Sequence, residues 1–140
     1  MPLNIDDVIE TFSMLDAWED RYRYLIDLGR TLDGLTDAER SEEHRVRGCA
    51  SQVWVVTDHT GDGAHSLLQF RGDSDAHIVK GLVALVLAFY SGHSAQDILT
   101  RDIAPLFKQL GLSEYLTPQR ANGVRAMVER IKRDAQTLAS

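Results

Sequence analysis

The sequence contains very little cysteine, with Cys49 alone among its 140 residues. One cysteine cannot form a disulfide within the chain and cannot supply the three or four ligands that a metal cluster needs. The five histidines do not form close pairs at helical spacing either. We therefore expect no metal site, and a free thiol that suits a reducing compartment such as the cytosol.

Long hydrophobic runs and an excess of basic charge are also absent. The most apolar segment, residues 78–90, is shorter than the roughly 20 residues that span a bilayer. The N-terminus lacks the basic and apolar regions of a secretory leader. The formal net charge of −6 disfavours a phosphate backbone as partner. We expect a cytoplasmic protein with no membrane partner and no nucleic-acid partner.

Sequence motifs for nucleotide binding and for serine hydrolases are missing too. The composition, 44% hydrophobic and 26% charged, is that of an ordinary globular protein. No linker, repeat or low-complexity tract divides the chain. We therefore expect a single domain over residues 1–140.

Apolar residues at helical spacing predict helices over residues 5–15, behind an Asn4 N-cap, and over residues 18–28. Thr36 and Glu39 have the spacing of a capping box. Runs rich in β-branched and aromatic residues then predict strands at 52–57 and 66–70.

The segment between these two strands, residues 58–63, has the glycines and aspartates of a hairpin turn. Residues 45–47 could add a third, edge strand, whose charges would discourage pairing between molecules.

The second half of the chain predicts helices. Residues 78–90 should form a central helix that covers the sheet, with Asp73 or Ser74 as its N-cap. A segment at 102–110 ends at a glycine, and a last helix starts at Thr117 and Pro118. The basic residues of this last helix suit its C-terminal end, where cations meet the helix dipole; they are Arg125, Arg130, Lys132 and Arg133. The order of elements predicts an α+β fold, a small antiparallel sheet of about three strands with helices on one face.

Cys49 lies among small residues, Gly48, Ala50 and Ser51, which leave the sulfur approachable and the backbone adjustable. Arg45 and Arg47 precede it, and nearby cations favour the nucleophilic thiolate. A lone cysteine is also often an inert, buried small residue. The residues alone leave both interpretations open.

Four segments of the chain carry a resemblance to a known family. GCASQVW at 48–54 resembles the GCxSQVW signature of the SufE family of desulfurase activators. GDSDAHIVKGL at 72–82 and LTPQRANG at 116–123 are similar to two further segments of that family, and WEDRY at 18–22 to its WE-x-K/R-Y. The matches keep the family's order and span nearly the whole chain. Departures are few: Ala50 stands where the family often has Gln, and Gln119 where it often has Ser.

The resemblance implies a curved antiparallel sheet with flanking helices, and a persulfide carried on Cys49. It implies a cysteine desulfurase as partner, SufS-like or CsdA-like, whose pyridoxal phosphate (PLP) belongs to the desulfurase, so that this chain needs no cofactor. The sulfur would pass on to an iron–sulfur scaffold. The chain itself is then a sulfur-transfer accessory protein with a persulfide intermediate.

The resemblance also implies that Asp75 and Arg120 lie around the cysteine loop, where Arg47, Gly48, Ser51 and Gln52 contribute to loop shape or partner binding. Simpler roles exist for two of them: Asp75 suits the positive end of the following helix, and Arg120 could pair with an acid in its own helix. Asn122 and Gly123 suit packing or capping.

Two other functions use the same cysteine. A thiol peroxidase or redox sensor would cycle Cys49 through sulfenic acid but lacks a resolving thiol in the chain. A non-catalytic adaptor would not need the thiol at all. For the carrier we expect Cys49 to rest against apolar neighbours, sheltered from oxidants, and its loop to move for delivery.

Overall fold

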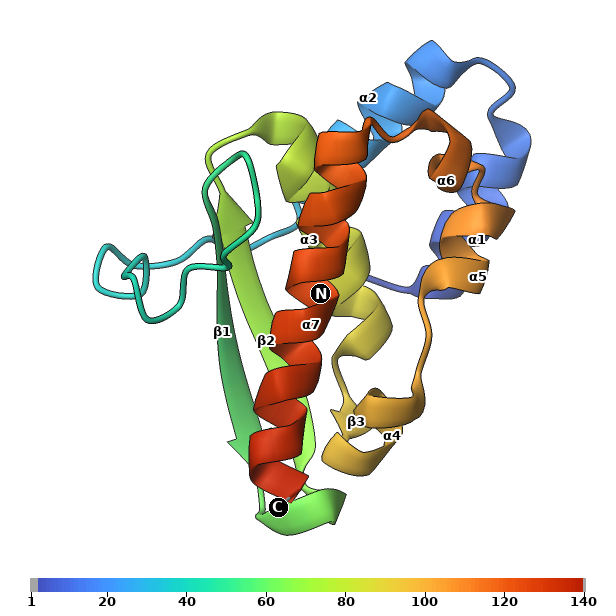
Figure 1. Ribbon diagram of the computed structural model, residues 1–140. Helices are drawn as coiled ribbons and strands as arrows, with labels where there is room; N and C mark the ends of the chain where they lie inside the picture. The colour runs from blue at the N-terminus through green and yellow to red at the C-terminus, as the bar shows by residue number, and fades with distance from the viewer. Residues whose placement is uncertain (1–2, 140) are drawn as a thin grey trace.

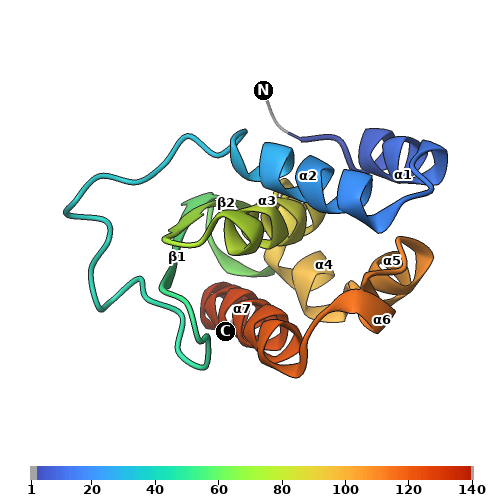
Figure 2. The ribbon, with the colours of Figure 1, turned by 90° about the horizontal axis from the view of Figure 1, so that it is seen from above.

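The computed structural model describes residues 3–139, in which two helices precede a β-hairpin and further helices follow (Figures 1 and 2). Helices α1 (Ile5–Met14) and α2 (Trp18–Gly29) come first, and the hairpin strands are β1 (Val53–Thr60) and β2 (Leu67–Ser74). The remaining elements are η1 (Gly63–His65), α3 (His77–Tyr90), β3 (His93–Ser94), α4 (Ala95–Thr100), α5 (Ala104–Gln109), α6 (Leu112–Tyr115) and α7 (Pro118–Ala139).

The three strands form one antiparallel sheet in the order β1-β2-β3, which confirms the expected α+β fold. The third strand is not the expected one. Residues 45–47 make a single bridge, Arg45 to Trp54, at the β1 edge, and β3 pairs with the other side of β2. The ladder at 45–47 is short because turns precede it and Gly48, at a φ of +94°, redirects the chain.

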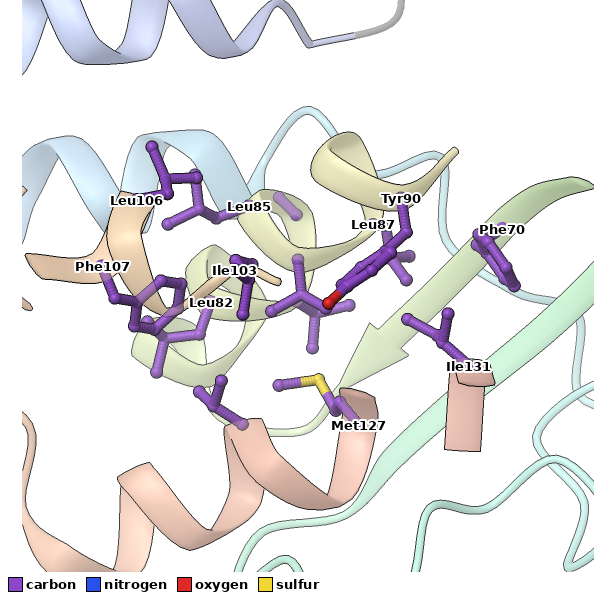
Figure 3. Close-up of a cluster of buried hydrophobic side chains, with 14 of the residues drawn as sticks. Phe70, Leu82, Leu85, Leu87, Tyr90, Ile103, Leu106, Phe107, Met127 and Ile131 are labelled. Carbon is purple, nitrogen blue, oxygen red and sulfur yellow. The ribbon is translucent and has the colours of Figure 1, made fainter. Parts of the chain in front are cut away.

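Helix α3 is the centre of the core, as its hydrophobicity predicts: nine of its fourteen residues are buried. Figure 3 shows its side chains among those of Phe70 from β2, Phe107 from α5 and Met127 from α7. Close contact with the sheet needs Gly72 in β2, since a Cβ there would lie 2.9 Å from a Leu87 methyl.

Helix α2 packs against α3 on the side away from α7 (Figure 2). The crossing brings the two backbones together at Gly81, where a Cβ would overlap the carbonyl oxygen of Leu25. A glycine inside a helix usually weakens it, so its presence here reflects the close approach.

Two predicted helix starts have the expected caps, and the reciprocal bonds of the predicted capping box form around a turn that does not continue into a helix. The Asn4 side chain accepts a hydrogen bond from the Asp6 amide at 2.8 Å, and Thr117 Oγ1 accepts from the Arg120 amide at 3.2 Å. Thr36 and Glu39 cap each other reciprocally.

The predicted cap of α3 is wrong, because the helix begins only at His77, after Ala76. Asp73 and Ser74 instead end strand β2, and both are buried there.

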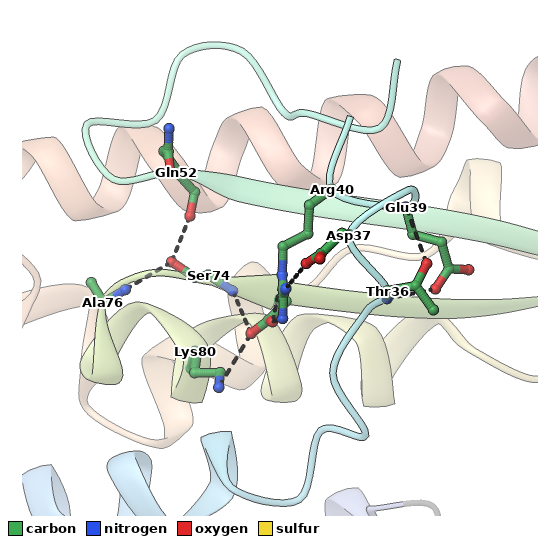
Figure 4. Close-up of polar contacts among 9 residues, drawn as sticks. Thr36, Asp37, Glu39, Arg40, Gln52, Ser74, Ala76 and Lys80 are labelled. Carbon is green, nitrogen blue, oxygen red and sulfur yellow. Dashed lines mark hydrogen bonds and ion pairs between the residues drawn. The ribbon is translucent and has the colours of Figure 1, made fainter. Parts of the chain in front are cut away.

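Asp73 anchors the long segment 30–52, which connects α2 to β1 and leads to the cysteine. Its carboxylate is 2.8 Å from Arg40 Nη2 in that segment and 3.2 Å from Lys80 Nζ in α3 (Figure 4). Burial acts to raise the pKa of Asp73, but hydrogen bonds from Arg40, the Ser74 amide and Lys80 together hold it below its ordinary value. The segment before Cys49 is thus attached to both β2 and α3.

A second ion pair attaches the same segment to the sheet, from Glu39 to Arg71 of β2 at 2.7 Å. The hydrogen bond from Arg71 is the largest cause that lowers the pKa of Glu39 to about 2. Both contacts fix where the segment starts its approach to the cysteine loop.

Helix α7 lies along the sheet and α3, with Val124, Met127 and Ile131 among its buried residues (Figure 1). The expectation that its basic residues mark its C-terminal end is wrong. The helix continues to Ala139, and its last turn has no basic residue. No helix within residues 3–139 is both long and apolar enough to cross a membrane.

Candidate functional site

The cysteine loop, residues 47–52, lies between the bridge at Arg45 and strand β1 and rests on α7. Gly48 sets its shape: a φ of +94° strains any residue with a Cβ, and a Cβ there would also lie 3.3 Å from that of Ala126 in α7. The glycine therefore permits both the turn and the close approach to α7.

The Cys49 thiol is half-buried and points at the backbone of α7. Its Sγ lies 3.5 Å from the carbonyl oxygen of Gly123, to which it donates a weak hydrogen bond. A side chain at position 123 would extend toward the sulfur, because a Cβ there would already be 3.5 Å from Sγ. The sequence prediction assigned Gly123 to packing or capping and missed this contact; a glycine inside a predicted helix is the signal that indicates it.

A cavity of about 260 Å³ lies beside the thiol, between the loop, the start of α3 and the start of α7. Its apolar wall comes from α3 and α7 and consists of Ile78, Val79, Leu82, Val124 and Met127, with Ala76 beside them. Its polar wall consists of Thr117, Gln119 and Arg120. Cys49 thus has apolar neighbours on one side and an arginine on the other.

The end of the loop is tied to the segment between β2 and α3. Asp75 accepts a hydrogen bond from the Gln52 amide at 3.1 Å and donates its own amide to the Gln52 carbonyl at 3.3 Å. Ser74 Oγ donates to the same carbonyl at 2.7 Å (Figure 4). These three bonds fix the backbone just after Cys49, and the Asp75 carboxylate faces the loop.

The other predicted site residues divide into two groups. Ser51 and Arg120 line the cavity together with Cys49. Arg47 does not: its side chain is 79% exposed and lies 3.3 Å from Glu42, outside the cavity. The structure therefore brings Arg120, but not Arg47, to the wall beside the sulfur.

The pKa of the Cys49 thiol is raised, because burial disfavours the charged thiolate more than the positive charge of Arg45 favours it. The arginines that precede the cysteine were expected to promote the thiolate. Their effect is real for Arg45, but the half-buried position outweighs it. In this conformation the sulfur is a protonated, protected thiol at neutral pH.

The pH dependence of alkylation tests this state. Because the thiolate is the reacting form, the rate with iodoacetamide should rise through the raised pKa of Cys49, with a midpoint above the roughly 8.5 of a free thiol. The same protein unfolded in urea is the control and should titrate at the ordinary value. A folded-state midpoint equal to or below the unfolded one would contradict a protected thiol.

Comparison with known proteins shows which family the chain belongs to. Residues 6–135 match the family model described as SufE, an Fe–S metabolism associated domain. An uncharacterized SufE-like protein of Rhizobium meliloti is 52% identical over 133 residues, with 95% of each chain covered. One of Rhizobium etli is 50% identical over 137 residues, covering 98% of this chain and 93% of the relative.

Among solved structures, the solution structure of a hypothetical protein from Thermus thermophilus has the same fold. Its TM-score is 0.73 at 21% identity, over 96% of this chain and 94% of that one. The match over most of the chain and the level of identity to both rhizobial proteins agree with the four sequence motifs. The chain therefore belongs to the SufE family, and its role lies in iron–sulfur metabolism.

Proposed function

We propose that this protein accepts persulfide sulfur from a PLP-dependent cysteine desulfurase onto Cys49, stimulates that enzyme and passes the sulfur to iron–sulfur cluster assembly. The observation that carries the proposal is the position of the one thiol: half-buried, against the Gly123 carbonyl, beside a cavity with an apolar wall. Membership of the SufE family supports the metabolic context.

The transfer is a thiol exchange at sulfur and involves no net oxidation. The Cys49 thiolate attacks the outer sulfur of the donor's cysteine persulfide. A new S–S bond forms on Cys49 as the donor's S–S bond breaks, and the donor cysteine leaves as a thiolate. The hydrogen on the outer sulfur stays there, so that Cys49 carries an S–SH group.

To deliver its sulfur, Cys49 must move away from the Gly123 carbonyl. The anchors on both sides of the cysteine restrict this motion to a short segment of the loop. Before Cys49 the chain is anchored through Arg40 to Asp73, and after it through Gln52 to Asp75. Between the anchors, Gly48 can adopt backbone dihedral angles that are sterically forbidden to residues with a Cβ. Motion confined to about residues 47–51 would carry the thiol outward while the sheet and α7 stay in place.

The cavity gives the acquired sulfur a place to stay. The apolar wall from α3 and α7 covers one side of the sulfane sulfur and limits the approach of free thiols, which reduce persulfides. Arg120 in the opposite wall can balance the negative charge of a persulfide anion.

The proposal assigns PLP to the desulfurase, SufS-like or CsdA-like, and leaves this chain without a cofactor. Within residues 3–139, no three His, Cys, Asp or Glu side chains are grouped to hold a metal ion, so we assign cluster building to a separate scaffold protein. We expect the exchange to take place in the cytosol, where a free thiol stays reduced.

A peroxidase or redox-sensor function fits the site less well. Such cysteines usually have a lowered pKa, whereas burial raises that of Cys49, and the chain has no second cysteine to resolve a sulfenic acid. Rapid hydrogen peroxide consumption by the isolated protein would favour that function instead.

The experiment that tests the proposal measures alanine formation by a cysteine desulfurase supplied with cysteine. Adding this protein should raise the rate severalfold, because Cys49 removes the sulfur that otherwise blocks the enzyme's own cysteine. Protein whose thiol has been alkylated beforehand is the matched control and should not stimulate. An unchanged rate at saturating wild-type protein would overturn the proposed function.

A further inference from the structure

A group of arginines gathers beside the cysteine loop, in a chain whose net charge is −6. Four arginines line a groove of about 230 Å³, together with Val46, Ala126 and Glu129: Arg45 from the bridge, Arg47 from the loop, and Arg130 and Arg133 from α7. We call these four arginines the arginine face. None of the four lines the cavity beside Cys49.

One member of the arginine face has a structural role. The Arg130 guanidinium, 13% exposed, donates to the backbone carbonyls of Glu43 at 2.9 Å and Arg45 at 3.4 Å, and is 3.3 Å from the Asp134 carboxylate. It fastens the approach to the cysteine loop onto α7. The backbone up to Arg45 is therefore fixed, and Arg47 follows it at the start of the loop.

Two members of the face are held only loosely by acids of this chain. The side chains of Arg47 and Arg133 are 79% and 69% exposed. Arg47 shares the single exposed carboxylate of Glu42 with Arg45, at 3.3 and 3.5 Å. Exposed pairs of this kind contribute little, so both guanidiniums can exchange their partner at low cost.

Arg133 is in a similar position. It is 3.9 Å from Asp134, but that carboxylate already accepts from Arg130 and, at 2.8 Å, from Thr57 Oγ1. The positive charge of Arg133 is therefore only partly neutralised within the chain.

We infer that the arginine face docks an acidic surface of the protein that delivers sulfur to Cys49, an inference that rests on the proposed function. A donor must bring its own reacting sulfur to within bonding distance of Cys49. The groove of the arginine face begins beside this cysteine, because Ala126, which lines the groove, is also the residue against which Gly48 packs. A donor large enough to reach Cys49 is therefore expected to cover the arginine face as well. Opposite charges across such a contact raise the association rate and fix orientation.

The overall negative charge makes the same contact selective. An acidic partner is repelled by the rest of this surface and attracted at the arginine face, so it meets the loop in one orientation. The net charge of −6 also disfavours nucleic acid as occupant, since a phosphate backbone would be repelled everywhere else.

The test reverses charge at the two most exposed members of the face, in the double variant Arg47→Glu/Arg133→Glu. The matched control is Arg23→Glu/Arg30→Glu, which makes the same change in net charge at exposed positions on and just after α2, across α3 from α7. The measurement is the protein concentration that gives half-maximal stimulation of the desulfurase. At low salt it should rise about tenfold for the arginine-face variant and at most about twofold for the control, and the difference should shrink near 0.5 M salt.

Other outcomes separate the two claims. If wild-type protein gains sulfur from the desulfurase but both double variants shift equally, or neither shifts, the docking inference is wrong and the proposed function stands. If wild-type protein gains none, both fail. Loading of Cys49 by inorganic polysulfide should be unchanged in the arginine-face variant. Loss of this loading would assign the shift to a damaged loop and overturn the inference. Salt-sensitive binding of a single-stranded oligonucleotide, lost in this variant, would assign the face to nucleic acid and overturn the inference.

Discussion

Cys49→Ser is expected to abolish sulfur acceptance and to return desulfurase turnover to the rate of the enzyme alone. A serine hydroxyl is nearly isosteric with the thiol but is not a nucleophile toward sulfur at neutral pH, so the fold should persist while the transfer stops. The measurement is alanine formation in the presence of saturating variant. The effect should be a complete loss of stimulation, the largest functional change that one substitution in this chain can give.

Ser51→Ala is the control for that variant. Ser51 lines the same cavity, half-buried, and its removal changes the loop without touching the sulfur. Because its thiol is intact, it should still accept sulfur and stimulate the desulfurase well above the rate of the enzyme alone. Full stimulation by Cys49→Ser would instead identify the protein as an adaptor that acts by binding alone.

Gly81→Ala should cause the largest loss of stability. The added methyl overlaps the Leu25 carbonyl oxygen, and because both groups belong to packed helices, α2 and α3 must move apart. We expect a loss of about 3 kcal/mol or more in the free energy of unfolding, measured in urea, which corresponds to a Tm lower by roughly 10 °C.

Gly123→Ala provides the comparison, since it is the same substitution in another helix. A Cβ at 123 would make ordinary contact, 3.5 Å from Cys49 Sγ, so the gain in helix propensity of up to about 1 kcal/mol should offset any crowding. Equal destabilisation by both substitutions would contradict the close approach of α2 and α3 at Gly81.

The fold could be predicted from sequence wherever a long apolar pattern or a cap was present. The hydrophobic run at 78–90 indicated α3, and Thr117 with Pro118 indicated the start of α7, because these signals are local. Strand β3 was missed, since His93–Ser94 is two residues long and has no pattern of its own. Helix α6 was missed for the same reason, being a single turn after Gly111.

The wrong assignment of Asp73 as a helix cap has a cause that local patterns do not contain. Its partner Arg40 lies 33 positions away along the chain. Asp73 has the residue type of an N-cap, yet a buried ion pair with Arg40 and Lys80 satisfies its charge at the end of β2.

The sequence indicated which residues lie near Cys49 but not how they contact it. The resemblance placed Asp75 and Arg120 near Cys49, and both lie around the cysteine loop. The contact of Sγ with Gly123 joins residues 74 positions apart, which no local pattern reveals. The sequence predicted a lowered pKa for the Cys49 thiol, because arginines close to it in sequence were assumed to be close to it in space. Arg47 turns away to Glu42, and burial then dominates.

Whether Cys49 carries sulfur can be decided from the intact mass of the protein after incubation with a cysteine desulfurase and cysteine. We predict a mass increase of one sulfur atom, located on the peptide that contains Cys49 and removed by a reducing agent. No mass increase, while the desulfurase turns over cysteine, would contradict a carrier role for this thiol.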